Sequence, residues 1–357
     1  MFELLARRRI PGIRKRRVLR TSAFILLIGV TRLPAQLDLN TFQPDIQRVF
    51  GQAKAAIVRI TAEDEHGRLA GTGFFIDPSG TIYTSYTIGG ETHDIIVEFG
   101  SNRYPARRLV SDRRSNLAIL KVDATTPWLQ INQSDDLKIA TPVIVIGYPM
   151  GLPATPNFGI VGGIDKKYLD HYFPIALIRA NLSIQRGEIG APLINLKGEA
   201  VGVVLSTIGD RTACYALPMK AAERIHADYM RFGEIRPGWI GAATEDSGNP
   251  KHDSTAMIKD IAPGSPAANA GLQIGDIVLR IGKTEIHEAP DVPDASFFIT
   301  AQEDVPITVL RDSKEVTLTI TAVDHPDYGI QRAPLIAPSR PVSRQSVLQD
   351  SLRLEKN

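Results

Sequence analysis

The first of two predicted domains contains four side chains suited to nucleophilic or acid–base chemistry: Cys214, His66, His93 and His171. Cys214 is the only cysteine of the chain, which rules out an internal disulfide. It lies in the strand-like run Thr-Ala-Cys-Tyr-Ala-Leu, which predicts a buried, unreactive thiol. The three histidines are singly scattered and are predicted to be exposed. Asp170 precedes His171, but two adjacent ligands without further partners predict no metal site.

Short strands separated by turns are predicted to position these side chains. The turn Asp77-Pro-Ser-Gly80 carries proline and glycine where a tight reversal needs them. The number of strands favours an all-β fold of two small barrels over a single barrel. Strands or hairpins are predicted at Ala55–Thr61, Gly73–Tyr83, His93–Phe99, Leu117–Val122, Val143–Gly147, Ile160–Ile164, Ile175–Arg179 and Ala191–Leu205.

A helix and a linker are predicted to separate the first domain, 42–222, from a second one at 238–323. The helix is predicted at Met219–Phe232, where alanine and isoleucine recur at helical spacing and neither glycine nor proline interrupts. We take 223–237 as the helix and linker segment. In the second domain, Ser265–Ala270 is predicted to be a short helix because serine, proline and a following glycine mark its ends. Strands are predicted there at Ala256–Ile261, Asp276–Ile281 and Val316–Ile320.

The charge of the chain is concentrated at its beginning. The formal net charge is +2, but residues 1–35 contain nine basic residues and one acidic residue, so the remainder is mildly acidic. The basic stretch precedes the apolar run Ala23–Val30, an order typical of a secretory signal peptide. We therefore interpret 1–36 as a signal peptide or an N-terminal anchor. Basic residues are not clustered within a folded domain, so no nucleic-acid partner is expected.

The polar tail 327–357 contains several prolines and is predicted to be disordered.

Six motifs follow one another along the first domain: Gly71-Thr-Gly-Phe-Phe-Ile76, Val145-Ile-Gly-Tyr-Pro-Met-Gly-Leu152, Gly159-Ile-Val161, Ala191-Pro-Leu-Ile-Asn195, Gly198-Glu-Ala-Val-Gly202 and Tyr215-Ala-Leu-Pro218. In this order they resemble the HtrA (Deg) family of trypsin-like serine proteases with a PDZ domain, and their agreement in order is far more specific than any single motif. The resemblance covers residues 45–323. It implies two six-stranded-type barrels of the trypsin-like fold followed by a PDZ domain.

The resemblance implies a catalytic histidine and aspartate, and this sequence departs from the family at both positions. The histidine position within 84–88 is occupied by Thr87, whose hydroxyl cannot act as a general base near neutral pH. The aspartate position within 115–121 is occupied by Asn116. An amide lacks the charge that stabilises an imidazolium.

The family's serine position is also changed. It falls on Ile189 within 187–195, and an isoleucine side chain has no nucleophilic atom. Gly187 and Glu188 form the former oxyanion loop. We expect the Glu188 carboxylate to oppose a developing negative charge nearby.

The second domain resembles the PDZ domain of the family. The run Gly238-Trp-Ile-Gly-Ala242 is similar to the loop and strand that receive a peptide carboxyl terminus. The resemblance therefore implies peptide binding by β-augmentation. The predicted peptide-binding residues are Trp239, Ile240, Gly241 and Ala242; the alternative for Trp239 is core packing.

These features predict a non-enzymatic HtrA-like protein that binds unfolded polypeptides or protein C-termini. Its predicted role is that of a chaperone-like, scaffold or regulatory factor. The predicted location is the periplasm or cell envelope, and no cofactor or metal is expected. Two alternatives stay open: an active serine-type endopeptidase with an unconventional site, and a modulatory subunit. As a subunit it would form a homotrimer or join the oligomer of an active relative, with Phe42 and Phe50 where contacts could form.

Overall fold

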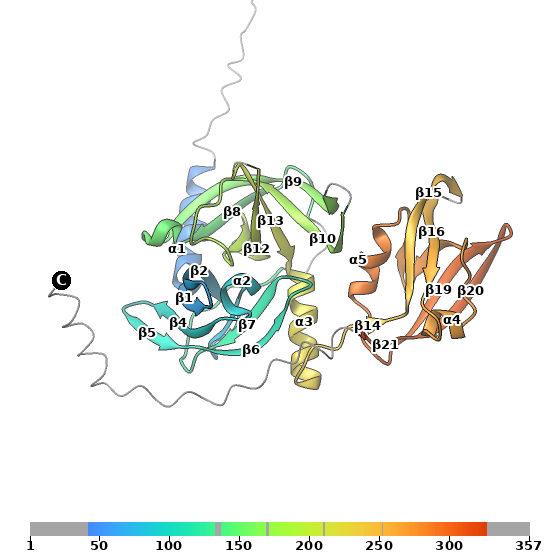
Figure 1. Ribbon diagram of the computed structural model, residues 1–357. Helices are drawn as coiled ribbons and strands as arrows, with labels where there is room; N and C mark the ends of the chain where they lie inside the picture. Colours follow the sequence, from blue (N-terminus) through green and yellow to red (C-terminus); the bar gives the residue numbers. More distant parts are fainter. Residues whose placement is uncertain (1–41, 133–136, 169–170, 210, 252, 327–357) are drawn as a thin grey trace, which may run out of the picture. The chain divides into compact units, whose positions relative to one another are not determined.

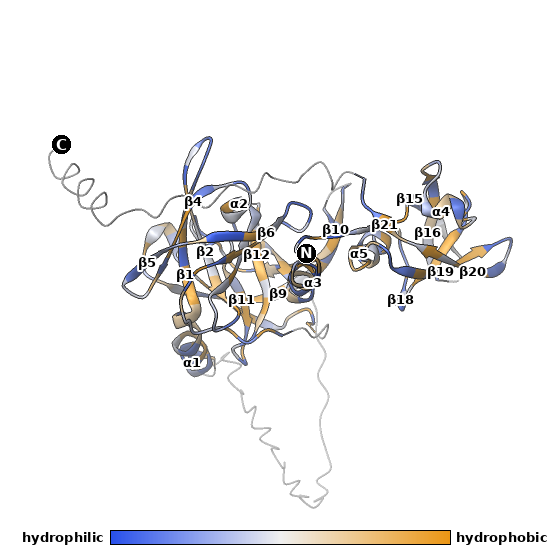
Figure 2. Cartoon of the chain, turned by 90° about the horizontal axis from the view of Figure 1, so that it is seen from below, coloured by the Kyte–Doolittle hydropathy of each residue, from blue (hydrophilic) through white to orange (hydrophobic). Residues whose placement is uncertain are grey.

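The protein is described by a computed structural model that places residues 42–132, 137–168, 171–209, 211–251 and 253–326. The predicted export segment 1–36 and the predicted disordered tail 327–357 lie outside the described residues. Strands dominate the described chain, as predicted, and form two barrel-like sheets, a third sheet of six strands and a two-stranded sheet, β14-β21 (Figure 1). Figure 2 shows that many of the strands carry apolar residues, whereas several connecting loops are hydrophilic. None of the helices in these ranges combines the length and apolar character that a bilayer crossing needs.

The first sheet has seven strands in the order β5-β4-β1-β2-β3-β7-β6. The resemblance had implied six strands, one fewer. The strands at the two edges, β5 and β6, come from the chain between β4 and β7, where no strand was predicted. At the β2–β3 turn the Ser79 amide donates to Asp77 Oδ1 over 2.8 Å. Gly80 has φ +92°, and a Cβ there would lie 2.3 Å from the Val122 carbonyl oxygen, so the turn requires glycine. The strands are β1 Ile57–Asp64, β2 Gly67–Phe75, β3 Thr81–Ser85, β4 His93–Phe99, β5 Asn102–Pro105, β6 Arg107–Asp112 and β7 Leu117–Lys121.

The second sheet is a closed barrel in the order β10-β13-β12-β11-β8-β9. Closure leaves no unpaired edge. His171 is the first residue of β10 and pairs with Tyr168 of β9, and both strands extend beyond their predicted ranges. The His171 side chain is exposed. Cys214 of β13 is buried, as predicted. The strands are β8 Pro142–Gly147, β9 Thr155–Tyr168, β10 His171–Asn181, β11 Pro192–Asn195, β12 Ala200–Ile208 and β13 Ala213–Pro218.

Helices join and cover the barrels. The α1 helix, Gln43–Ala53, precedes β1, and the four-residue α2 helix, Tyr86–Gly89, follows β3. The α3 helix spans Met219–Phe232, as predicted, and ends where Gly233 adopts φ +74° and donates its amide to Tyr229. Such a left-handed residue is a common helix stop.

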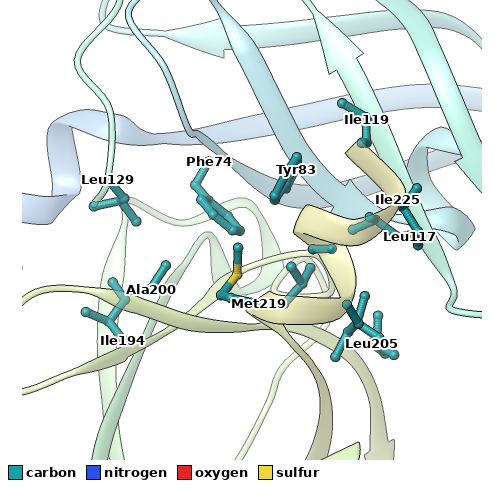
Figure 3. Packing of buried hydrophobic residues seen from close by; sticks show 14 of the residues in the cluster. Phe74, Tyr83, Leu117, Ile119, Leu129, Ile194, Ala200, Leu205, Met219 and Ile225 are labelled. Carbon is teal, nitrogen blue, oxygen red and sulfur yellow. The ribbon is translucent and has the colours of Figure 1, made fainter. Parts of the chain in front are cut away.

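A shared apolar cluster holds the two barrels and α3 together (Figure 3). Phe74 and Tyr83 from the first barrel are fully buried and pack edge to face at 6.0 Å between ring centroids. Met219 and Ile225 of α3 belong to the same cluster, as does Leu205 of β12. This packing fixes β3, and therefore α2 after it, relative to the second barrel.

The third sheet has the order β15-β16-β17-β19-β20, which leaves one side of β15 unpaired. The predicted short helix is α4, where the Ser265 side chain accepts a hydrogen bond from the Ala268 amide. A further helix, α5, follows β18 and was not predicted. The elements are β14 Gly238–Trp239, β15 Ala242–Lys251, β16 Ser254–Ile261, α4 Pro266–Asn269, β17 Ile277–Ile281, β18 Thr284–Glu285, α5 Asp291–Phe297, β19 Asp304–Arg311, β20 Lys314–Thr321 and β21 Val323–Asp324.

Candidate functional site

Thr87 and Asn116 are brought close by the pairing of β3 with β7. Thr87 lies in α2, directly after β3, and its side chain is exposed. The amide of the preceding residue, Tyr86, donates a 2.8 Å hydrogen bond to the Asn116 carbonyl oxygen. Asn116 is half-buried and adopts φ +58°, a left-handed conformation that asparagine tolerates better than most residues. The backbone therefore joins the histidine and aspartate positions of the family.

The loop that carries Ile189 packs against the same region. The Thr72 amide donates to the Ile189 carbonyl oxygen over 2.9 Å. Gly190 has φ +86°, and a Cβ there would lie 2.2 Å from the Thr72 carbonyl oxygen and 3.0 Å from the Ser85 amide nitrogen. The half-buried Ile189 side chain packs against an apolar cluster of each barrel, including Ile88 beside Thr87. The structure thus gathers all three predicted positions in one region between the barrels.

The backbone of the predicted oxyanion loop keeps two amides free of backbone partners among the described residues. Gly187 adopts φ +94°, and its carbonyl oxygen accepts a 2.6 Å hydrogen bond from Thr72 Oγ1. Within the described chain, the amides of Gly187 and Ile189 donate no hydrogen bond to the backbone. Two free amides at such a turn can stabilise a carbonyl oxygen that gains negative charge.

The effect of Glu188 on charge in this loop stays a prediction, and the structure places its side chain inside the second barrel. The Glu188 side chain is fully buried and packs against Gly147 of β8. Its two oxygens accept hydrogen bonds from the Gln185 amide at 2.6 Å and from Asn157 Nδ2 at 2.8 Å. Burial nevertheless raises the pKa of Glu188 above its ordinary value, and these bonds only partly offset that effect. The two hydrogen bonds hold the loop from within the second barrel, although burial disfavours the ionised form of Glu188.

The chemistry available at the three positions is limited to a hydroxyl and an amide. Thr87 supplies an alcohol, Asn116 a neutral amide, and Ile189 only hydrocarbon. Within the described residues, His66 and His93 make no hydrogen bond to any of these three positions; their nearest carboxylates are Asp64 and Asp94. A hydrolytic step here would need a nucleophile other than residue 189.

A second site lies on the third sheet, in a groove between β15 and α5. All four predicted peptide-binding residues, 239–242, line it. The groove has a volume of about 370 Å³, and Arg114, Tyr172 and Pro174 of the barrel domain also border it. The opposite wall comes from α5 and the residues after it, which the sequence did not single out. These residues are Val292, Pro293, Ser296 and Ile299.

Hydrogen bonds hold the carbonyl oxygens of the loop at the head of this groove. The Ile240 carbonyl accepts from the Ala267 amide at 2.9 Å, and the Gly241 carbonyl accepts from the Ala262 amide at 2.8 Å. The amides of Ile240 and Gly241 donate no hydrogen bond to other described residues. Gly241 has φ +79°, and a Cβ there would lie 2.3 Å from Ser265 Cβ, so this turn requires glycine. Two free amides beside an unpaired strand edge are suited to a carboxylate.

Comparison with known proteins agrees with this geometry. A trypsin-like peptidase domain matches residues 71–203, and a PDZ domain matches residues 238–322. A probable periplasmic serine endoprotease DegP-like from Halomonas elongata is 31% identical over 278 residues, covering 74% of this chain and 58% of the relative. The protein of the same name from Marinomonas sp. is 30% identical over 308 residues, covering 82% of this chain and 64% of the relative. The chain therefore combines a trypsin-like peptidase domain with a PDZ domain and is similar to DegP-like endoproteases.

Solved HtrA structures share the fold. The HtrA-type protease AlgW with tripeptide superimposes with a TM-score of 0.70 at 21% identity, covering 79% of this chain and 97% of that one. The serine endoprotease from Yersinia pestis superimposes with a TM-score of 0.62 at 25% identity, covering 78% of this chain and 98% of that one. The predicted architecture, trypsin-like barrels followed by a PDZ domain, is therefore confirmed.

The prediction that the chain is not an enzyme is contradicted by these comparisons. These relatives are named serine endoproteases, which suggests a protease and not a non-enzymatic protein. The same names describe periplasmic proteins, which supports the predicted compartment. The chain spans about 58% to 64% of the length of these two relatives.

Proposed function

We propose that this HtrA-like protein binds the carboxyl termini of polypeptides in the cell envelope, as a chaperone-like, scaffold or regulatory factor. The observation that carries the proposal is the groove between β15 and α5, with an unpaired strand edge and the free amides of Ile240 and Gly241 at its head. An incoming peptide would extend the sheet as an additional strand, and its carboxylate would accept hydrogen bonds from the loop.

The groove walls favour an apolar last residue on the peptide. Ile240, Val292 and Ile299 line the groove and belong to the buried apolar cluster of this domain. A carboxylate bound at the Ile240 and Gly241 amides would place the last side chain of the peptide close to them.

Peptide binding is tested by fluorescence anisotropy with a labelled peptide pool that ends in valine, alanine or phenylalanine. The pool with free carboxylates should bind at least about tenfold more tightly than the same pool with terminal carboxamides, because an amide loses the charge-assisted hydrogen bonds. Ser296→Glu should weaken binding because it places a negative charge in the groove. The matched control is Thr319→Glu on the exposed face of β20. Equal affinity for the two pools would overturn the proposal.

Peptide-bond hydrolysis is a second candidate function, favoured by the endoprotease names of the relatives and by the free amides of Gly187 and Ile189. It would proceed at an unconventional site, because Ile189 has no nucleophilic atom. The test is cleavage of unfolded casein by the purified chain and by Ile189→Ala. The expected result is turnover that survives the substitution. Absence of cleavage by both proteins would reject this candidate and leave peptide binding untouched.

A modulatory role within an HtrA oligomer follows from the same similarity. The exposed Phe158 ring of β9 lies 5.9 Å from the Phe42 ring, which gives the outer face of the second barrel an aromatic pair. Co-expression with an HtrA protease followed by native mass spectrometry tests this role. Mixed assemblies would support it, whereas exclusively separate proteins would reject it.

A further inference from the structure

Three ligand-type side chains converge on the first barrel, away from the positions described above. Glu63 near the end of β1 pairs directly with His93 at the start of β4, and Asp94 follows His93. One ligand atom from each of the three residues lies within 4.8 Å of the others. His93 Nδ1 and Asp94 Oδ2 are 3.0 Å apart. An imidazole and two carboxylates, from two strands thirty residues apart in sequence, therefore meet at one place.

The ladder irregularity between β1 and β4 produces this convergence. The register shifts between the Thr61–Ile96 and Glu63–His93 pairs, because β4 has one more residue than β1 between them. Asp94 adopts φ +49°, so its side chain does not follow the regular alternation of a strand. In a regular strand the side chains of His93 and Asp94 would point to opposite faces, whereas here both reach the same group of atoms.

The two carboxylates have little cationic compensation. Glu63 meets Arg68 at 3.4 Å, and the Arg68 side chain is 77% exposed. Asp94 Oδ2 contacts the Nδ1 atom of the His93 ring. Two like charges within 4.8 Å repel one another unless a cation lies between or beside them. All three side chains also remain accessible, with exposed fractions of 44% for Glu63, 56% for His93 and 74% for Asp94.

We propose that Glu63, His93 and Asp94 bind a divalent transition-metal ion, with Zn²⁺ as the best match. One nitrogen and two carboxylate oxygens are donors that Zn²⁺ accepts, and three protein ligands leave one tetrahedral position for water. Mg²⁺ and Ca²⁺ fit less well because they prefer oxygen donors throughout. A bound ion would join the end of β1 to the segment that follows α2, and so brace the chain just after Thr87.

The test is isothermal titration of the tag-free full chain with ZnCl₂ in a non-chelating buffer. The wild-type protein should bind one equivalent, and Zn²⁺ should raise its thermal midpoint. His93→Ala should weaken binding at least about tenfold, as should Glu63→Gln, which keeps the size of the side chain and removes its charge. The matched control is His66→Ala, on the neighbouring β1–β2 hairpin with its side chain 90% exposed. It should bind Zn²⁺ like the wild type.

Thermal midpoints without metal separate loss of the site from loss of the fold. Because His93 is largely exposed, His93→Ala should melt within a few degrees of the wild type in the absence of Zn²⁺. Wild-type affinity weaker than millimolar would overturn the proposal. Unchanged binding by His93→Ala would overturn it too, as would an equal loss in His66→Ala.

Discussion

At the residue scale, Glu188 shows how burial gives a side chain a different role from the one its sequence position suggests. Its neighbours in the chain indicated a charge beside the oxyanion loop. The structure instead places the carboxylate inside the second barrel, bonded to the Gln185 amide and to Asn157. Sequence alone could not distinguish these orientations, because both have the same backbone path.

The pH dependence of stability tests this placement of Glu188. Its folded pKa is raised, so its contribution to stability is present below the ordinary value of 4.5 and is lost as pH rises through the folded pKa. Glu188→Gln should remove this loss, about 1.4 kcal/mol for each pKa unit of the shift. The measurement is urea unfolding between pH 4 and pH 8.

Glu199→Gln is a control of opposite sign. Hydrogen bonds from Asn195 and Asn132 lower the Glu199 pKa, so its contribution is lost as pH falls. If the free energy of unfolding varied with pH in the same way for the wild type and Glu188→Gln, this would contradict the burial of an ionisable group at this position.

Cys214 provides a second test at the residue scale. Burial raises the pKa of its thiol to about 12, and its side chain has no exposed surface. Native protein at pH 8 should therefore react with a thiol reagent such as DTNB only as it unfolds, and denatured protein should react at once. Stoichiometric labelling of native protein within minutes would show that this strand is open to solvent.

At the element scale, the sequence predicted strands and helices well where a periodic pattern was long, or where glycine, proline or a capping residue marked the ends. The bounds of β4, His93–Phe99, and of α3, Met219–Phe232, were predicted from composition and spacing alone. The α5 helix was missed because it is only seven residues long and contains Pro293. Short helices carry too few periodic positions to be distinguished from turns. As a result, one wall of the peptide groove could not be predicted.

A polar contact within the apolar core also attaches α3 to the first barrel. The Tyr83 hydroxyl donates to Glu223 Oε1 at 2.5 Å and lies 3.0 Å from His226 Nδ1, both on α3. Burial, together with the Glu223 charge, raises the Tyr83 pKa well above its usual value, so the group stays a neutral donor. A buried donor of this kind fixes the rotation of the helix against the sheet.

Tyr83→Phe should therefore destabilise the protein by about 1–3 kcal/mol, because a half-buried carboxylate and imidazole lose their shared partner. Urea unfolding measures this loss. Tyr104→Phe is the control, since the Tyr104 hydroxyl accepts only a 3.3 Å bond from the exposed Asn102 side chain. An equal effect of the two substitutions would indicate that α3 is held by its apolar face alone.

At the scale of the whole molecule, the three predicted triad positions could be assigned from the sequence because each lies in its own local frame, and the assignment stays a prediction. Thr87, Asn116 and Ile189 could be assigned without knowing how the barrels pack. The meeting of Glu63 with His93 and Asp94 could not be predicted in the same way, because it depends on strand register and on the backbone angle at Asp94. A search for local motifs cannot find contacts that depend on strand register.

For the whole molecule, we propose that the groove beside β15 receives a polypeptide carboxyl terminus. The most direct measurement is amide chemical-shift mapping of the isotope-labelled protein. The titrants are a hexapeptide ending in valine with a free carboxylate and its carboxamide counterpart. We predict saturable shifts at Ile240, Gly241 and the residues of β15 with the carboxylate, and much smaller shifts with the carboxamide. Shifts of equal size with both peptides, or shifts confined to the barrels, would contradict the account.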